Sequence, residues 1–402
     1  MASIMKRLKS FLSRFLPPSR KAFQKSSSAI LAETHRLETH LEQLEEEHLK
    51  AQELYHKDLA SISRCLSLLT EENQQLKLQL QLQSEEITAL RKGRKTQTRQ
   101  VMQRFGKERL LQQHDYLSRL KPEEYARELA LIYRRRTGKI LNLENPRTFN
   151  EKIQWLKLYD STPLKTRLAD KYLVRDWVAE TIGQEYLIPL LGVWDSFSDI
   201  NFDALPDQFV LKANHGSGWN MIVTDKSQLD MADAKSKFDQ WMGTNFAFSS
   251  SLELHYINIP PKIIAETYIE ELGQLYDYKF MCFDGTVAFL WVDIGRHAVH
   301  ERAMFTPDWE RMDDLIGIRP PYQGEVPRPD NLGEMLALAS KLSRGFAHVR
   351  VDFYNVNGKI YFGEMTFTSG TGFSRFSSQQ FALRVGDMIT LPPKSPIPEL
   401  KY

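Results

Sequence analysis

Two carboxylates near the C-terminus stand at matched positions on either side of a turn. Asp352 lies six residues before Gly358, and Glu364 lies six residues after it. Apolar and polar residues alternate on both sides of Asn357-Gly358, a typical hairpin turn pair, so residues 349–366 predict two paired strands. The two acids are then expected at the same depth, close enough to share a hard cation such as Mg²⁺. From these residues alone, a surface hairpin with one acid on each strand is the alternative.

A lysine and a glycine-containing loop lie more than a hundred residues earlier. Residues 208–223 predict a strand that carries Lys212, a small polar loop and a second strand. A strand lysine that faces a cleft supplies positive charge for phosphate, and Gly216 and Gly218 let backbone N–H groups approach phosphate oxygens. No Gly-Lys-Ser/Thr follows, so this is not a P-loop. Alone, the loop is a weak indication of a nucleotide site.

A third segment has an acid at the end of an apolar strand. The apolar residues 263–265 lead into Glu266, and after a short linker a second strand ends at Asp284-Gly285, a turn pair. Backbone groups of a linker are able to hydrogen-bond to the edge of an adenine. An acid after the linker is able to hydrogen-bond to ribose hydroxyls. These residues alone do not decide the matter.

Composition limits the classes of protein to consider. The 402 residues suit about two folded units plus extensions, and 42% hydrophobic content provides for a sizeable core. The net charge of +2 predicts no nucleic-acid partner. Cys65 and Cys282 are the only cysteines and lie far apart, which favours a reducing compartment over a disulfide scaffold. No apolar run approaches the roughly 20 residues that span a bilayer.

The N-terminal region predicts a membrane-surface helix. Residues 1–25 hold seven Lys and Arg and no acid, and their apolar residues recur at steps of three and four until Pro17-Pro18. Such a helix suits an anionic membrane surface, which suggests a cytoplasmic protein held peripherally on the inner face of the plasma membrane. The alternative is a helix that packs on its own domain.

Residues 29–91 contain no Gly or Pro and predict a coiled coil. Apolar residues keep a heptad spacing with one extra four-residue step near Tyr55, and Asn73 at a core position favours a defined register, often a parallel dimer. The basic linker 92–116 follows. It contacts an anionic lipid or glycan, or is simply solvated.

From residue 117 the pattern becomes that of a folded domain. Helices are expected from Pro122 to Tyr133, after an N-cap at Thr148 or Asn150, and over 167–182. Strands and helices then alternate, which indicates an α+β or α/β core.

The order of these segments resembles the ATP-grasp superfamily, in which a nucleotide lies between two α+β subdomains. The nearer likeness is to its teichuronopeptide-biosynthesis (TupA-like) branch. The likeness covers about residues 117–391 and implies an α+β ATP-grasp domain over 117–402. Its motifs are NPRTFNEK (145–152), ADKY (169–172), LPDQFVLK (205–212), NHGSG (214–218), DYKF (277–280) and the RVDFY…GEMTF hairpin.

The resemblance implies ATP and Mg²⁺ as cofactors. Lys171 and Lys212 resemble the phosphate-contacting lysines, and Asp352 and Glu364 the acids that hold Mg²⁺. For the rest of the nucleotide, it implies a phosphate loop of His215, Gly216, Ser217 and Gly218, an adenine hinge of Glu266, Tyr268 and Ile269, and a ribose acid at Asp277, with Glu270 or Glu271 as alternatives.

The catalytic residues follow from the same resemblance. Arg350 resembles the arginine that steadies an acyl phosphate, and Ser369 and Thr371 belong to a loop near the substrate and γ-phosphate. Thr366 stands where the family usually has an Asn that binds metal. Residues 293–297 together with Arg302 line an acceptor pocket or form an ordinary loop.

The activity implied is an ATP- and Mg²⁺-dependent ligation of a carboxylate to an amine through an acyl phosphate. Its expected place is surface-polysaccharide biosynthesis, with an amino acid and a uronic-acid unit of a glycan precursor as substrates. Two alternatives stay open: a glycosyltransferase or other transferase of that pathway, and a non-catalytic membrane-associated scaffold with a degenerate ATP-grasp domain.

Overall fold

The computed structural model describes residues 28, 30, 32–36, 112–249, 251–269, 276–294 and 301–401. The chain divides into two units, Met1–Arg104 and Phe105–Tyr402, and the second is called here the C-terminal unit. In the first unit, residues 28, 30 and 32–36 are helical. The predicted basic helix 1–25, the rest of the coiled coil 29–91 and residues 92–111 of the linker lie outside the described residues, so these predictions stay untested.

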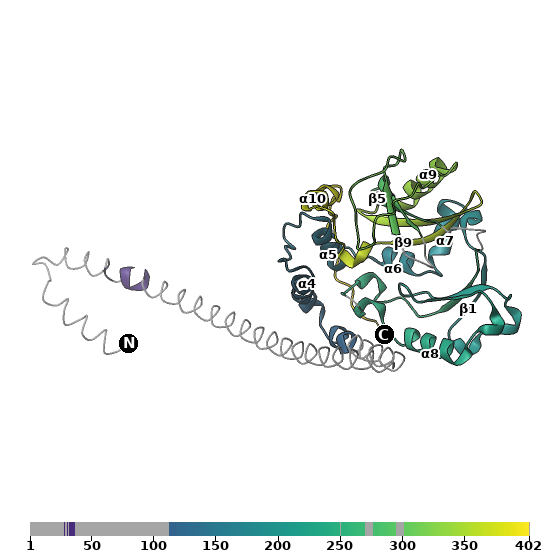
Figure 1. Ribbon diagram of the computed structural model, residues 1–402. Helices are drawn as coiled ribbons and strands as arrows, with labels where there is room; N and C mark the ends of the chain where they lie inside the picture. Colours follow the sequence, from purple (N-terminus) through teal and green to yellow (C-terminus); the bar gives the residue numbers. More distant parts are fainter. Residues whose placement is uncertain are drawn as a thin grey trace, which may run out of the picture. The chain divides into compact units, whose positions relative to one another are not determined.

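The C-terminal unit is built on two antiparallel sheets (Figure 1). The small sheet has the order β1-β4-β2-β3, with β1 Leu190–Trp194, β4 Ile263–Thr267, β2 Phe209–Ala213 and β3 Asn220–Val223. The large sheet has the order β7-β6-β5-β8-β9, with β7 Glu301–Phe305, β6 Thr286–Ile294, β5 Asp277–Phe283, β8 Val349–Val356 and β9 Lys359–Thr366.

Helices cover these sheets. The α-helices are α4 Pro122–Thr137, α5 Phe149–Tyr159, α6 Pro163–Ala169, α7 Val174–Thr181, α8 Met231–Met242, α9 Leu332–Ser343 and α10 Gln379–Asp387. Short 3₁₀ turns are η1 Gln184–Tyr186, η2 Phe197–Asp199, η3 Phe202–Ala204, η4 Lys226–Gln228, η5 Phe246–Phe248, η6 Leu254–Tyr256 and η7 Ser369–Gly372. No helix within the described ranges is both long and apolar enough to cross a bilayer.

Successive strand residues point to opposite sides of the large sheet, so one face is apolar and the other carries ionisable side chains beside a second buried apolar cluster. Phe280 of β5 and Phe353 of β8 lie on the face that packs against Leu342 of α9. Lys279 and Asp352, one position earlier on these strands, are cross-strand partners on the opposite face. The burial of the apolar face therefore places a row of ionisable side chains on the other.

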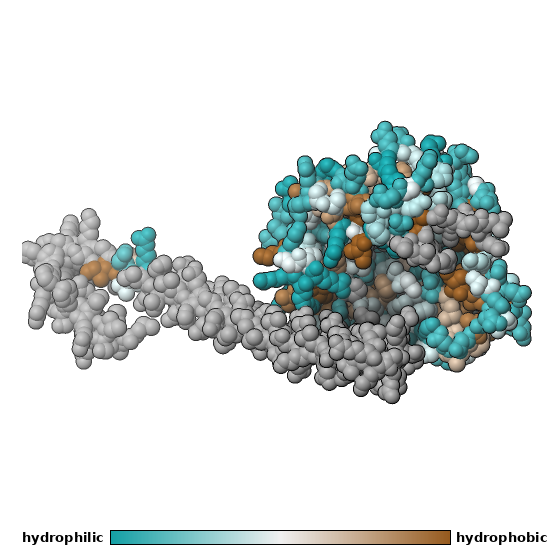
Figure 2. Space-filling view, viewed as in Figure 1, coloured by the Kyte–Doolittle hydropathy of each residue, from teal (hydrophilic) through white to brown (hydrophobic). Residues whose placement is uncertain are grey.

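The same alternation orients β2 in the small sheet. Phe209, Leu211 and Ala213 are fully buried in a core that includes Phe238 of α8. Lys212 lies between two of these core residues and must point to the other face. Figure 2 shows that hydrophilic side chains cover most of the visible surface of the C-terminal unit.

The structure confirms the predicted 349–366 hairpin. Asn357 and Gly358 both have positive φ, at 51° and 81°, as the two-residue turn requires. Asp352 and Glu364 are direct cross-strand partners, and a bulge follows Asp352. The two acids therefore lie at the same depth, as predicted, but it is the bulge that brings Asp352 opposite Glu364, since the register of the turn alone would pair it with Gly363.

The helix predictions are partly confirmed. Thr148 is the N-cap of α5, where its hydroxyl accepts from Glu151 N and Glu151 accepts from Thr148 N at 2.8 Å. The single helix predicted over 167–182 is wrong, because α6 ends at Ala169 and α7 begins at Val174. Asp170 causes the break: its carboxylate accepts from the backbone N–H groups of the next turn, in competition with the helix.

Candidate functional site

One arginine joins the two acids of the hairpin. Arg350 donates from Nε to Asp352 Oδ1 and from Nη2 to Asp352 Oδ2, both at 2.6 Å. The same Nη2 donates to Glu364 Oε1 at 2.7 Å. Burial lowers the pKa of Arg350, but Asp352 and Glu364 raise it by more, so its pKa lies above its usual value. Arg350, Asp352 and Glu364 thus come together as predicted.

Lys279 extends this network to Asp277. Its Nζ lies 2.6 Å from Asp352 Oδ2 and 2.6 Å from Asp277 Oδ2. Burial lowers the pKa of Lys279, but the two carboxylates raise it by more, so the amine stays charged. Asp277, the predicted ribose acid, is only 2% exposed and lies within this ion-pair network. Its alternatives Glu270 and Glu271 lie outside the described residues.

Thr366 lies beside Glu364 on the same face of β9. Its hydroxyl donates to Glu364 Oε1 at 2.9 Å, and Thr366 is the cross-strand partner of Arg350. The Thr366 hydroxyl therefore orients Glu364. An Asn in place of Thr366 would be a metal ligand beside Glu364.

The small sheet presents a second ion-pair group. Lys212 Nζ lies 2.5 Å from Glu266 Oε2, and Arg175 of α7 donates to Glu266 Oε1 at 2.9 Å. Burial lowers the pKa of Lys212, but Glu266 and other anionic groups raise it by more. The side chain of Glu266, predicted in the adenine hinge, thus pairs with the predicted phosphate lysine.

Lys171 lies in the turn between α6 and α7 and donates from Nζ to the carbonyl oxygen of Gly216. Burial lowers the pKa of Lys171, and the carboxylate of Glu364 offsets part of this effect. Glu364 also raises the pKa of Lys212. Lys171 and Lys212, on the small-sheet side, therefore face Glu364, the carboxylate of the large sheet that is predicted to bind Mg²⁺.

These residues line one cleft between the two sheets. Its walls include Lys171, Arg175, Lys212 and Glu266 on one side and residues 362–365 of β9 on the other. The open space is about 20 Å³, room for little more than one water molecule. The paired side chains therefore fill the cleft.

The predicted phosphate loop is only partly in place. Ser217 and Gly218 are exposed after β2, and Gly218 has φ 73°. The side chain of His215 turns into the core instead, where Nε2 lies 3.1 Å from the Trp241 carbonyl oxygen. Burial lowers the pKa of His215 to about 4, so the ring is neutral. Its predicted contact with a nucleotide is thus limited to its backbone.

The predicted hinge continues past β4 at Tyr268 and Ile269. Both are half-buried, and neither is among the described residues that line the cleft. Residues 270–275, which follow them, lie outside the described part of the chain.

Side chains of α5 hold the loop that contains Ser369 and Thr371. Thr371 has φ 52°, in the left-handed region, and its carbonyl oxygen accepts from Lys157 Nζ at 2.6 Å. Gln154 donates to the carbonyl oxygen of Gly372 at 2.7 Å. Burial lowers the pKa of Lys157 to about 7. Thr371 thus contributes a backbone anchor to the loop.

Ser369 has a different environment. Its hydroxyl lies 3.3 Å from Nε2 of His348, and Nδ1 of that ring lies 3.1 Å from the Cys282 carbonyl oxygen. Burial lowers the pKa of His348 to about 3. In the neutral ring Nδ1 must donate to the carbonyl, so Nε2 accepts and the Ser369 hydroxyl donates to it.

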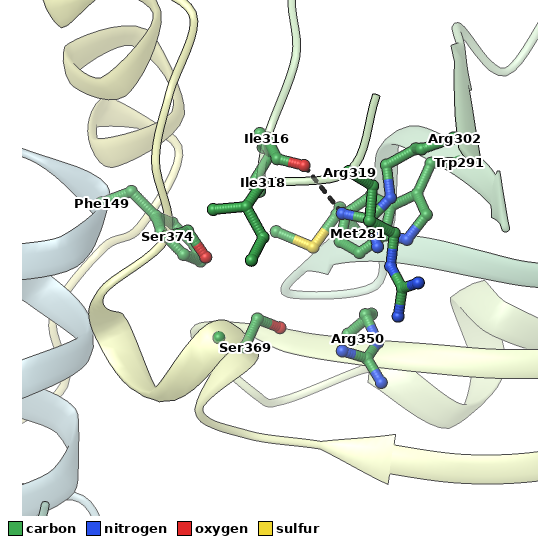
Figure 3. A pocket seen from close by; sticks show the side chains of 12 residues that line it. Phe149, Met281, Trp291, Arg302, Ile316, Ile318, Arg319, Arg350, Ser369 and Ser374 are labelled. Atoms are coloured by element: carbon green, nitrogen blue, oxygen red, sulfur yellow. Dashed lines mark hydrogen bonds between the residues drawn. The ribbon is translucent and has the colours of Figure 1, made fainter. Parts of the chain in front are cut away.

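A second cavity adjoins the hairpin acids and is called here the arginine pocket. It measures about 200 Å³ and is lined by Arg302, Arg319, Arg350, Trp291, Ser369 and an apolar wall that includes Phe149 and Ile316. Figure 3 shows these side chains gathered from several segments around one space. Arg350 thus faces this cavity while it holds the two hairpin acids.

The sequence reading missed three residues of the site. Arg175 and Lys279 act as ion-pair partners, and Lys157 holds the Thr371 loop. Arg175 stands one helical turn after Lys171, and Lys279 alternates with Asp277 along one strand, which are weak signals for a shared face. Nothing local marks Lys157, because its partners lie far away in sequence.

The donor set fits a hard divalent cation. Asp352 and Glu364 are directly opposed, and Oε2 of Glu364 accepts no hydrogen bond from the described residues. Both oxygens of Asp352 are paired with Arg350 or Lys279, so a shared cation has to displace one of them. Among the described residues no group of three His, Cys, Asp or Glu could hold a metal, which leaves phosphate oxygens to complete the coordination.

Comparisons with solved structures find distant likenesses. A D-alanine–D-alanine ligase from Bacillus anthracis is 20% identical, over 50% of this chain and 57% of that one, with a TM-score of 0.30. An L-amino acid ligase from Bacillus licheniformis is 15% identical, over 62% of this chain and 56% of that one, with a TM-score of 0.37. The likeness thus spans little more than half the length of these ligases. A search of curated protein sequences finds no significant match.

The family model gives a direct result. The model described as TupA-like ATPgrasp matches residues 151–390, which is more than half of the chain. The matched region contains both sheets and the ionisable residues of the cleft. This chain therefore belongs to the TupA-like ATP-grasp family.

Proposed function

We propose that this protein is an ATP- and Mg²⁺-dependent ligase that joins a carboxylate to an amine through an acyl phosphate. The observation that carries the proposal is the arrangement around Glu364. It is bound to Arg350 at 2.7 Å and lines the same cleft as Lys171 and Lys212. Cations and acids of both sheets thus converge where a triphosphate and its metal would lie.

In the proposed reaction a carboxylate oxygen attacks the γ-phosphorus of ATP, and the bond to the β-phosphate oxygen breaks to release ADP. The amine nitrogen then attacks the acyl carbon, phosphate leaves, and the nitrogen loses a proton. Such chemistry needs positioning and charge neutralisation more than covalent help from the protein. Mg²⁺, when bound, would neutralise phosphate charge.

The chain's own residues divide this work between the two sheets. Lys171 and Lys212 bind phosphate oxygens from the small-sheet side, after Lys212 exchanges Glu266 for the ligand. Asp352 and Glu364 hold the metal from the large-sheet side. Arg350 is placed to orient the reacting carboxylate, because it faces the arginine pocket and contacts both acids.

Binding of a non-hydrolysable ATP analogue tests the proposal. We expect Mg²⁺ to tighten binding of the analogue and Asp352→Asn to remove the Mg²⁺ effect. Lys212→Ala should weaken binding about ten- to a hundredfold, since one lost contact to a charged group is worth roughly 1.5–3 kcal/mol. Lys235→Ala is the matched control, because this exposed lysine pairs only with Asp239 on α8. Nucleotide binding that is indifferent to Mg²⁺ in the wild-type protein would refute the proposal.

A non-catalytic role is the second candidate. Both oxygens of Asp352 are engaged by cationic side chains, and Thr366 stands in place of the usual Asn. ATP-analogue binding without phosphate release, for every carboxylate and amine pair in a screen of amino acids and uronic acids, would favour this role. Stabilisation by nucleotide sugars rather than ATP in a thermal-shift assay would instead favour a transferase.

The wider setting is also part of the proposal. We propose that the substrates are an amino acid and a uronic-acid unit of a surface-polysaccharide precursor. The protein would self-associate through residues 29–91 and lie on the inner face of the plasma membrane through residues 1–25. Liposome flotation of the full chain and of a chain lacking residues 1–25 tests the membrane part, which fails if both behave alike.

A further inference from the structure

We propose that the arginine pocket binds the carboxylate group of a small substrate that also carries O–H or N–H donors. This inference rests on the proposed function and names the chemical class of its substrate. The steps below concern charge, hydrogen bonding, size and position.

The charge of the pocket favours an anion. Three guanidinium groups, those of Arg302, Arg319 and Arg350, line it, and no described lining residue is a carboxylate. Arg302 and Arg319 share one acid behind the wall, Asp293, at 2.7 Å and 3.8 Å from its Oδ1. In Figure 3 the side chains of Arg319 and Arg350 extend toward the same space. An anion between them would meet two guanidinium groups, of which Arg350 is already neutralised by Asp352 and Glu364, so the added attraction comes mainly from Arg319.

The two arginines next to Asp293 have different tasks. Arg302 is fixed, because it donates from Nε and Nη2 to Asp293 and from Nη1 to the Ile316 carbonyl oxygen at 2.7 Å. Its guanidinium also lies 4.5 Å from the centre of the Trp291 ring. Arg319 is 34% exposed at the opening of the pocket, where it can meet an incoming ligand. We therefore assign contact with the carboxylate mainly to Arg319.

Trp291 adds an uncharged donor. This side chain lines the pocket and is only 3% exposed, yet its Nε1–H has no hydrogen-bond partner among the described residues. An indole nitrogen only donates, and a buried donor without an acceptor is unfavourable. The nitrogen is itself enclosed by protein atoms, so a carboxylate oxygen would reach it, and supply the missing acceptor, after a small shift of the lining side chains.

Ser369 provides a hydrogen-bond acceptor rather than a donor. Because its hydroxyl hydrogen points to Nε2 of His348, the oxygen offers only lone pairs to a ligand. Figure 3 shows this hydroxyl on the same side of the pocket as Arg350. A ligand that satisfies both sets must carry an anion and a hydrogen-bond donor, as uronic acids and amino acids do.

Size and position complete the argument. A cavity of about 200 Å³ is smaller than the roughly 300–1,000 Å³ of sites for drug-sized molecules, so it suits a monosaccharide or an amino acid. Arg350 lines this pocket and is hydrogen-bonded to Glu364, which lines the nucleotide cleft. A carboxylate in the pocket thus lies one side chain away from the site of phosphoryl transfer.

Calorimetric titration with matched probes tests the inference. The probes are D-glucuronate against D-glucose and L-alanine against L-alaninamide, each added to the full chain with and without Mg²⁺ and the ATP analogue. We expect at least one carboxylate to bind tenfold or more tightly than its neutral partner. The pair with the larger ratio identifies a uronic acid or an amino acid as the occupant.

Variants locate the effect. In Arg319→Gln the affinities for the carboxylate probe and for its neutral partner should differ by less than twofold. Binding of the ATP analogue should stay unchanged. In Trp291→Phe the affinity for the carboxylate should fall several-fold. Arg328→Gln, at an exposed arginine outside the pocket, should behave like the wild-type protein.

The inference is overturned if neither carboxylate binds, if charged and neutral probes bind equally, or if the preference survives Arg319→Gln. These outcomes are separate from the nucleotide test. Carboxylate preference without Mg²⁺-linked nucleotide binding would remove the proposed ligase activity and leave the pocket assignment intact.

Discussion

Arg350 and Glu364 form a 2.7 Å hydrogen bond that links the nucleotide cleft to the arginine pocket. Glu364 lines the first cavity and Arg350 lines the second. Both residues project from the charged face of one hairpin, so the link depends on the pairing of β8 with β9. The sheet thereby holds the two cavities at a fixed separation, as transfer of a phosphoryl group in the proposed reaction would require.

This link predicts that Arg350→Lys weakens both kinds of binding together. A lysine ammonium cannot reproduce the fork that holds Asp352 through two atoms and Glu364 through one. We expect Mg²⁺-dependent nucleotide binding and carboxylate binding each to fall by about tenfold, the equivalent of roughly 1.4 kcal/mol. Lys212→Ala should weaken only nucleotide binding, and Arg319→Gln should weaken only carboxylate binding. An Arg350→Lys protein that loses just one of the two contradicts the link.

Thr366 predicts how strongly the site depends on Mg²⁺. Its hydroxyl orients Glu364 at 2.9 Å, so Thr366→Val should raise the Mg²⁺ concentration for half-maximal nucleotide binding about three- to tenfold. Thr366→Asn adds an amide oxygen, a suitable Mg²⁺ ligand, and should lower that concentration. Titration of Mg²⁺ against a fluorescent ATP analogue measures both. If neither change matters, Glu364 does not need its neighbour to hold the metal.

Three buried histidines predict that the C-terminal unit loses stability in mild acid. Burial lowers the pKa of His215 to about 4 and those of His255 and His348 to about 3. Below the unfolded value of about 6.5 the unfolded chain binds protons that the folded chain does not, so the free energy of unfolding falls as pH decreases toward 4. Together the three histidines change the free energy of unfolding by at most about 4 kcal/mol per pH unit.

Buried acids act in the opposite direction. Burial raises the pKa values of Asp170 and Glu253, so their protonation offsets part of the loss. His348→Gln isolates one histidine and should reduce the slope by up to about 1.4 kcal/mol per pH unit. Urea unfolding between pH 5 and pH 7, followed by tryptophan fluorescence, measures this, since all seven tryptophans lie beyond residue 104. An unchanged slope would mean that His348 has the same pKa in the folded and unfolded states.

Two helical glycines predict opposite effects of alanine. In α10, a Cβ at Gly386 would lie 2.2 Å from the Arg147 carbonyl oxygen, and backbone cannot move aside easily, so Gly386→Ala should cost about 1–3 kcal/mol or more. In α9, a Cβ at Gly333 would meet nothing within 4 Å. Gly333→Ala should therefore be neutral or stabilise by about 0.4–1 kcal/mol. Urea midpoints of the two variants give the comparison, and equal midpoints would contradict it.

The sequence alone determined the local structure of the site. Asn357-Gly358 and the alternation around it predict the hairpin, because turn geometry and strand period depend only on nearby residues. The N-cap at Thr148 follows for the same reason. The bulge after Asp352, which no local pattern predicts, moves the register by one residue and pairs Asp352 with Glu364 rather than with Gly363. The family motifs also singled out Lys171 and Lys212, and both line the cleft.

The tertiary structure decided which charges meet. Lys279 reaches Asp352 only because β5 lies next to β8 in the large sheet, although about 70 residues separate the two in sequence. The turning of His215 into the core and the arginine pocket also depend on long-range packing. Local patterns fix the direction of a side chain along its own strand or helix. Its partners are fixed by the order of strands and the packing of distant segments, which no short stretch of sequence encodes.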